Sequence, residues 1–141
     1  MKPNQKTLAV AALLLAAFSS NAALAARPTK QAALIERGSY LVNNAGMCID
    51  CHSPRNERGE LIAERALQGA PIGFTPAAPM PWAPSAPALA GLPSMTEAQA
   101  MTFLQTGVRP DGSRPRPPMP GYRFNEADAR AIVAFLKSLG K

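Results

Sequence analysis

Two cysteines and the only histidine of the chain stand together, as Cys48, Cys51 and His52. Their spacing is C-x-x-C-H, the attachment sequence of c-type haem. Two thiols three positions apart, near a helical turn, can both reach the two vinyl groups on one edge of a porphyrin. The next residue then projects its imidazole toward the iron. We therefore predict one covalently attached haem c, with thioether bonds to Cys48 and Cys51 and with His52 as the proximal iron ligand.

Other interpretations of this pentapeptide fit the sequence less well. A thioredoxin-like C-x-x-C motif needs a βαβ context, which the sequence pattern lacks. A disulfide between Cys48 and Cys51 would close a short loop and add little stability. A chance match would also have to explain why the single histidine directly follows the second cysteine. Two cysteines and one histidine are too few for a structural zinc site, which takes four such ligands.

The single histidine also limits the ligand on the other face of the iron. A bis-histidine site is impossible within this chain, so the sixth ligand is methionine, lysine, another weak donor or none. Met80 and Met119 lie in proline-rich segments, which are stiff enough to hold a thioether in place. Met101 falls on the apolar stripe of a predicted helix, where packing is the default role. The context Pro117-Pro118-Met119-Pro120-Gly121-Tyr122 favours Met119, with Met80 as the alternative.

Three segments have the periodic apolar pattern of helices. They span residues 29–43, 97–106 and 126–139. The apolar face of the first contains Gly38, and a glycine at such a position favours the close approach of another helix. A weak point in the helix is the alternative explanation of Gly38.

The ends of the second and third helices carry recognisable signals. Thr96 and Gln99 form the pattern of a capping box, and Gly107 provides a left-handed stop. Asn125 is the N-cap of the last helix, which ends at Gly140.

Long connections separate these helices. Residues 53–68 are charged and have a moderate helical pattern. Residues 69–93 contain seven prolines, which exclude a long helix or a central strand and predict an extended, packed loop. A second proline-rich loop at 115–121 has Met119 at its centre. No segment shows strand alternation beside a turn signal, so we predict an all-α fold.

The first 25 residues have the pattern of a secretory signal. Lys2 and Lys6 give a basic start, an apolar run follows from Leu8 to Phe18, and Ala23-Leu24-Ala25 fits the A-x-A cleavage rule. The apolar run is much shorter than the roughly 20 residues of a membrane helix. We expect a signal peptide at 1–25, cleavage after Ala25 and one mature domain at 26–141, with no membrane span after cleavage.

Composition and charge narrow the classes of function. A chain of 141 residues with 47% hydrophobic residues is one folded domain, and a fully disordered chain is excluded. Removing Lys2 and Lys6 leaves 13 basic against 9 acidic residues, a net charge of +4. This charge argues for an acidic partner. The sequence has no run of consecutive basic residues and little aromatic interleaving, so we expect no nucleic-acid binding.

The mature chain resembles small class I c-type cytochromes of bacteria over essentially its whole length. The stretches that carry the resemblance are 36–42, 48–55, 118–120 and 125–139, with sequences ERGSYLV, CIDCHSPR, PMP and NEADARAIVAFLKSL. It is most similar to the cytochrome domains that serve periplasmic dehydrogenases. The resemblance implies a class I cytochrome c fold, in which three to four helices and long proline-rich loops surround one haem. It also implies that the first and last helices cross at Gly38, against Phe135.

The expected function is electron transfer. Ligation by His52 and Met119 would leave no open coordination position, which suits outer-sphere electron transfer rather than substrate chemistry. We expect a periplasmic carrier, not an enzyme, that accepts electrons from a donor such as a dehydrogenase and passes them to a terminal oxidase or another cytochrome. The alternative is a haem-based sensor or gas-binding protein with a vacant or labile sixth site. A peroxidase-type enzyme would need a distal acid or base, and no such arrangement is evident.

Several further side chains have expected roles around the haem. The residues expected to bury the macrocycle are Ile35, Leu41, Phe103, Leu104, Ile132 and Phe135. Trp82 is expected either to donate to a haem propionate or to pack within its loop. The arginines around the Met119 loop are Arg109, Arg114, Arg116 and Arg123. They form either a basic rim that steers an acidic partner or a solvated surface.

Overall fold

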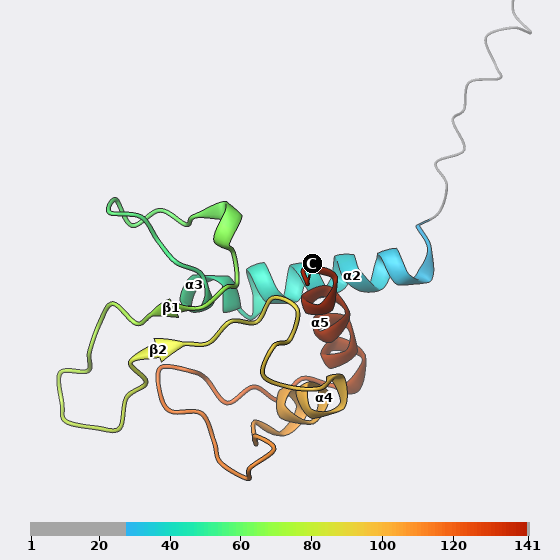
Figure 1. Ribbon diagram of the computed structural model, residues 1–141. Coiled ribbons are helices and arrows are strands. Elements are labelled where there is room, and N and C mark those ends of the chain that lie inside the picture. Colours follow the sequence, from blue (N-terminus) through green and yellow to red (C-terminus); the bar gives the residue numbers. More distant parts are fainter. Residues whose placement is uncertain (1–27, 141) are drawn as a thin grey trace, which may run out of the picture.

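The computed structural model describes residues 28–140, so the predicted signal peptide at 1–25 lies outside the described residues. In chain order the elements are α2 (Lys30–Tyr40), the π-helix η1 (Leu41–Ala45), α3 (Cys48–His52), the 3₁₀-helix η2 (Ala63–Arg65), β1 (Ala70–Pro71), β2 (Ser85–Ala86), α4 (Glu97–Thr106) and α5 (Glu126–Ser138) (Figure 1). The described part is predominantly helical with long connections, as predicted. None of its helices has the length and apolar character needed to cross a bilayer.

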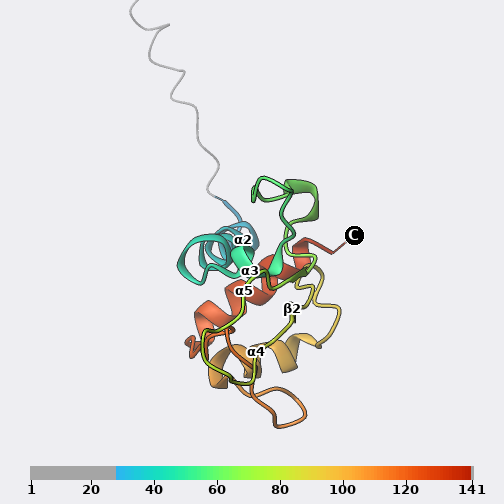
Figure 2. The ribbon, with the colours of Figure 1, turned by 90° about the vertical axis from the view of Figure 1, so that its left-hand side faces the viewer.

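Helices α2 and α5 cross in direct contact, and Gly38 lies at the crossing (Figures 1 and 2). A Cβ atom at Gly38 would lie 2.6 Å from the carbonyl carbon of Ala131 and 2.7 Å from Cβ of Phe135. Any larger residue would therefore push α5 away from α2. The predicted role of Gly38 is confirmed, including its contact with Phe135.

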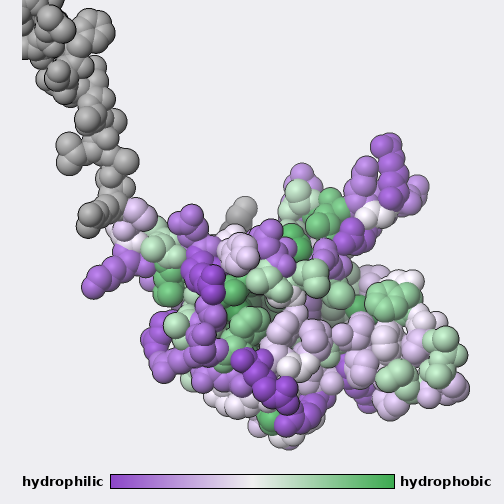
Figure 3. Space-filling view, turned by 180° about the vertical axis from the view of Figure 1, so that it is seen from behind, coloured by the Kyte–Doolittle hydropathy of each residue, from purple (hydrophilic) through white to green (hydrophobic). Residues whose placement is uncertain are grey.

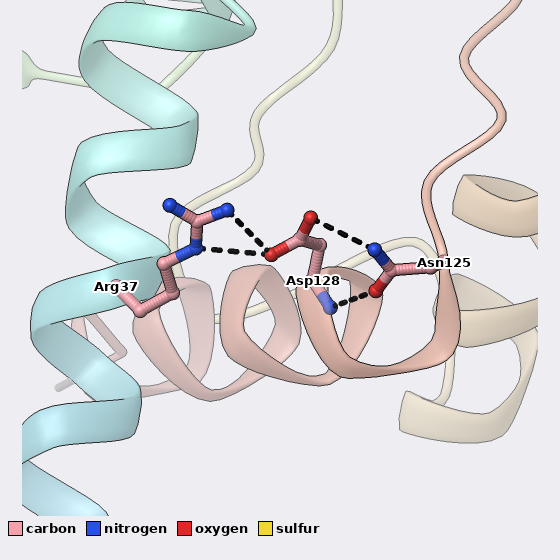
Figure 4. A network of polar contacts seen from close by, with 3 residues as sticks. All are labelled: Arg37, Asn125 and Asp128. Carbon is pink, nitrogen blue, oxygen red and sulfur yellow. Dashed lines mark hydrogen bonds and ion pairs between the residues drawn. The ribbon is translucent and has the colours of Figure 1, made fainter.

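A shared carboxylate links the two crossing helices on the surface (Figure 4). Arg37 in α2 places its Nη2 atom 2.9 Å and its Nε atom 3.0 Å from Oδ1 of Asp128 in α5. The other oxygen of Asp128 accepts a hydrogen bond from the side-chain amide of Asn125 at 3.2 Å. Asn125 also caps α5 by accepting from the Asp128 backbone N–H at 2.8 Å. Exposed ion pairs contribute about 0–1 kcal/mol, so this network orients the crossing more than it stabilises it.

The predicted signals at the ends of α4 are confirmed. The Thr96 hydroxyl accepts from the Gln99 backbone N–H, and the Gln99 side chain accepts from the Thr96 N–H, which completes the capping box. Gly107 ends the helix in the left-handed conformation, with φ of 69°. These local bonds fix where the loop toward Met119 begins.

The moderate helicity predicted for residues 53–68 is wrong apart from the single turn of η2. Asn56 explains the difference, because its side-chain oxygen accepts from the backbone N–H groups of Arg58 at 2.9 Å and Glu60 at 3.0 Å. Such local bonds compete with helix formation. They close a turn that also brings Arg55 and Leu61 into a β-bridge.

The proline-rich segment 69–93 is extended, as predicted, but it also contains two short strands. β1 and β2 pair antiparallel, with Ala70 opposite Ala86 and Pro71 opposite Ser85. Each strand has only two residues, which is too short to show the alternation of polar and apolar residues that predicts a strand. The pairing folds the segment back on itself and brings both of its ends to the helical core.

The core combines helical and loop residues. Val42 and Ile132 are fully buried, and so is Leu67 from the loop before β1, with 1% of its surface exposed. Leu67 has a left-handed φ of 60°. Its N–H donates to the Ser53 hydroxyl at 2.8 Å, and its carbonyl accepts from the N–H of Leu89 at 2.8 Å. The loops are therefore anchored in the core by backbone bonds over long sequence separations.

Candidate functional site

The five-residue helix α3 contains both cysteines and the histidine of the predicted attachment sequence. The π-helix η1 leads into it, and the Gly46 N–H closes η1 by donating to the Leu41 carbonyl at 2.7 Å. Met47, between the two helices, has a left-handed φ of 49°. This reversal starts a new helix at Cys48, so that Cys48 and Cys51 lie about one turn apart on a separate short element.

His52 is fixed in orientation by a backbone acceptor far away in the sequence. The residue is 5% exposed, and its Nδ1 atom lies 2.7 Å from the carbonyl oxygen of Pro87. A carbonyl can only accept, so Nδ1 donates, and in the neutral ring the lone pair is then on Nε2. Burial lowers the pKa of His52, while the hydrogen bond to Pro87 acts in the opposite direction. The Pro87 bond therefore selects the tautomer in which Nε2 is the nitrogen that can bind a metal.

The cysteines are partly buried, and no disulfide joins Cys48 to Cys51. Burial, with a smaller contribution from the neighbouring Cys51, raises the pKa of the Cys48 thiol to about 11. Cys48 is therefore a protonated thiol at neutral pH, which makes it a poor nucleophile toward disulfides.

A mostly apolar cavity of about 470 Å³ opens beside α3. Its volume lies in the range of small-molecule and cofactor sites. Four predicted site residues line it together, namely Cys48, Cys51, His52 and Met119. Its other walls come from α4, α5 and the segment that follows β2. Two thiols, one imidazole and one thioether around an apolar cavity can supply the two thioether bonds and two iron ligands of a haem c, so the residues present fit this group.

Only half of the residues predicted to bury the macrocycle line the cavity. Phe103, Leu104 and Ile132 do so. Leu41 lies in the hydrophobic core, and Phe135 packs against that core at the crossing with α2. Ile35 lines a separate hollow between α2, α4 and α5. Helical periodicity identifies apolar faces, but it does not tell which neighbour a face contacts.

Met80 and Trp82 lie away from the cavity wall. Met80 is 49% exposed, so the alternative axial ligand stands outside the cavity that contains His52. The Trp82 indole N–H donates to the Phe74 carbonyl at 3.1 Å, and the two rings pack edge to face at 5.7 Å. Of the two roles expected for Trp82, packing within the loop is the one that the structure shows.

Tyr122 joins the two sides of the cavity through a contact that sequence analysis missed. Its hydroxyl donates to the carbonyl of Gly46, just before α3, and its ring stacks on Phe124 at 5.0 Å between centroids. Burial raises the pKa of Tyr122 to about 12, so the hydroxyl remains a donor. The bond ties the Met119 loop to the attachment helix. The only signal in the sequence is that Tyr122 follows Met119 closely.

Pro87 is the other functional residue that sequence analysis missed. It orients His52 through its carbonyl oxygen, and any residue type supplies that atom. The residue type at position 87 therefore carries no signal for this role.

The four arginines near the Met119 loop fall into two pairs. Arg109 and Arg116 line the cavity, whereas Arg114 and Arg123 do not. Arg114 directs its Nη1 atom toward the Thr106 carbonyl at 3.4 Å. The four arginines expected to form a basic rim are thus divided between the cavity wall and the outer surface.

Comparison with known proteins agrees with this geometry. The family model described as "Cytochrome c" matches residues 35–140, from the middle of α2 to the residue before the C-terminus. A search of curated proteins finds no match.

Proposed function

Because the chain belongs to the cytochrome c family, we propose that it is a periplasmic electron carrier whose haem iron is bound by His52 and Met119. Members of this family carry haem c, and this chain is accordingly a haem-based electron carrier. We propose in addition which residues hold the cofactor, where the protein is located and which partners it has.

The observation that carries the ligand assignment is that His52 and Met119 line the same cavity as Cys48 and Cys51. In the proposed site the two cysteines form the thioether bonds, His52 binds the iron through Nε2, and Met119 binds it through sulfur. The haem, when bound, supplies an iron that gains or loses one electron. Methionine as the sixth ligand favours a higher reduction potential than a second histidine.

The remaining residues of the site hold these ligands and exclude water. Pro87 fixes the ring of His52, and Tyr122 fixes the loop that contains Met119. Leu104 and Ile132 are nearly fully buried where they line the cavity. Low polarity around the iron disfavours its more highly charged ferric state, which raises the potential further.

The proposed donor is a periplasmic dehydrogenase, and the proposed acceptor is a terminal oxidase or another cytochrome. The secretory pattern of residues 1–25 and the resemblance to dehydrogenase-linked cytochromes support this assignment.

The test of this proposal is the absorption spectrum of protein purified from an exporting host. In the oxidised wild type we expect a weak sulfur-to-iron charge-transfer band at the red end of the spectrum. Met119→Ala should lose this band and retain covalent haem, whereas Met80→Ala should keep it. Loss of the band in Met80→Ala alone would assign the ligand to Met80. Rapid binding of carbon monoxide by the reduced wild type would instead indicate an open sixth site and a sensor.

A further inference from the structure

Two arginines line the cavity that would hold the haem, and we propose that Arg109 and Arg116 bind the two propionate carboxylates of the haem. This inference rests on the proposed function only in that the cavity holds haem c. It concerns the carboxylates of the cofactor rather than its iron or its thioether bonds.

The charge inventory of the cavity wall leads to this assignment. The lining residues with ionisable side chains other than Cys and Tyr are Asp50, His52, Arg109 and Arg116. His52 is the proposed iron ligand, and Asp50 pairs with Arg55 at 3.4 Å. Two arginines therefore remain for the two carboxylates of haem. Carboxylates against an apolar wall are costly unless they are paired.

Arginine is also the side chain whose geometry suits this role. Its planar guanidinium can donate two parallel hydrogen bonds to one carboxylate, and it stays charged at every physiological pH. One arginine for each propionate would satisfy both anions without a further cation.

Hydrogen bonds within its own turn hold Arg109 in place without any ligand. Its backbone N–H donates to the Ser113 carbonyl at 2.8 Å, and its carbonyl accepts from the Gly112 N–H at 2.9 Å. Its Nη1 atom donates to the Arg114 carbonyl at 3.1 Å. The turn thus holds one end of the guanidinium, and the other nitrogen atoms remain available for an anion.

Arg116 belongs to the same turn as the proposed iron ligand. The Met119 N–H donates to the Arg116 carbonyl at 3.2 Å, and the Ala83 N–H donates to the Pro117 carbonyl at 2.8 Å. These bonds hold the turn against the segment that leads into β2. One short loop would therefore supply both an axial ligand and a propionate partner.

Trp82, Arg114 and Arg123 do not line the cavity wall. The Trp82 N–H donates to the Phe74 carbonyl. Arg114 and Arg123 lie outside the cavity wall and carry the same charge as the proposed pair. They are therefore matched controls for the loss of one positive charge from this region.

The reduction potential should report the interaction. A guanidinium next to a propionate offsets its negative charge. When the guanidinium is removed, the uncompensated carboxylate stabilises the ferric iron by Coulomb attraction, and the potential falls. The low-frequency propionate bands in the resonance Raman spectrum should shift as well, because they respond to hydrogen bonds at the carboxylates.

The experiment compares Arg109→Gln and Arg116→Gln with Arg114→Gln and Arg123→Gln, all as holoproteins. We expect the first two to lower the potential and shift the propionate bands, and the two controls to leave the bands in place and change the potential less. Arg116→Lys should recover part of the potential. Ser113→Ala removes the hydroxyl that accepts from Arg109 Nη1 at 3.4 Å and keeps both guanidinium groups, so we expect it to leave the bands unchanged.

Unchanged propionate bands in both Arg109→Gln and Arg116→Gln would overturn the inference, and so would equal potential shifts in all four glutamine variants. If Arg109→Gln does not fold, the exposed Arg116 still decides the question. Each variant should retain covalent haem and the methionine band. A wild type without haem would contradict the proposed function instead, so that the two failures are distinguishable.

Discussion

The loop at residues 53–65 and the segment at residues 66–96 follow one another along the chain, yet they differ in charge and in contacts. The loop is rich in ionisable residues, and the segment contains none. Figure 3 shows the difference: the loop projects as a deep purple arm at the upper right, and the outer end of the segment below it is pale purple and green. At the tip of the loop, the side chain of Asn56 bonds only to residues within four positions of it. Segment residues bond to α3, to the Met119 loop and to α5.

This difference shows that length and irregularity alone do not distinguish a loop that builds the core and the site from one that does neither. The uncharged segment supplies Leu67 to the core, the Pro87 acceptor to His52 and several residues to the cavity wall. The charged loop supplies no residue to the cavity wall and no acceptor to His52. Its only buried residues are Ser53 and Pro54, at its start. Substitutions in the segment should therefore affect stability and the haem site together, whereas those at the tip of the loop should affect neither.

Among the largest expected effects is that of a substitution at Gly69, for which Gly59 is the matched position. Gly69 and Gly59 both have left-handed φ angles, of 84° and 80°, but only at Gly69 would a Cβ meet other atoms, at 2.9 Å from the Ala88 nitrogen. Replacing either glycine by alanine costs about 1–2 kcal/mol of backbone strain. Gly69→Ala should lose about a further 1–3 kcal/mol through overpacking. Denaturant unfolding of the two holoproteins measures this, and equal losses would show that Gly69 is not tightly packed.

The next effect contrasts two leucines. Leu67→Ala should destabilise the protein by about 2–5 kcal/mol, because it empties a fully buried site. Leu61, in the charged loop, is 37% exposed. Leu61→Ala should cost less than about 1 kcal/mol. If thermal or denaturant unfolding gave Leu61→Ala the greater loss, the assignment of core and surface would be reversed.

A smaller effect concerns the hydroxyl that anchors Leu67. Ser53→Ala leaves the buried Leu67 N–H without its acceptor and should cost about 1–3 kcal/mol. Ser53 directly follows His52, so we also expect a shift of the haem absorption bands. Asn56→Ala is the matched change in the exposed turn, and it should cost about 1 kcal/mol or less without a spectral shift. A spectral shift in Asn56→Ala would mean that the charged loop does reach the site.

The smallest effect is expected at the tip of the charged loop. Arg58→Glu reverses a charge on an exposed residue whose backbone alone takes part in the turn. Stability should change by no more than about 0.5 kcal/mol, and the reduction potential should stay close to that of the wild type. A large change in potential would place this loop near the iron.

Local sequence signals account for the parts of the molecule that could be predicted. The capping box of Thr96 and Gln99 and the N-cap of Asn125 bond only within their own helices, so a short stretch of sequence contains all the partners. The attachment pentapeptide is similarly local. The role of Gly38 could be predicted because a glycine on the apolar face of a helix favours the close approach of another helix.

The remaining features depend on partners that are distant in the sequence. Pro87 orients His52 across 35 positions, and Tyr122 reaches Gly46 across 76. The division of the arginines, with Arg109 and Arg116 at the cavity, follows from how the loop is folded. The helical prediction for 53–68 failed because side-chain bonds of Asn56 outweighed a moderate periodicity. No pattern within a short window contains these contacts.

The central claim is that one haem is bound covalently through Cys48 and Cys51, and intact-mass spectrometry of the exported protein under denaturing conditions tests it most directly. Denaturation breaks iron–ligand bonds but leaves thioethers intact. We predict the mass of residues 26–141 plus one haem, and the bare chain for a Cys48→Ala/Cys51→Ala variant. A wild-type mass equal to that of the bare chain would contradict the account.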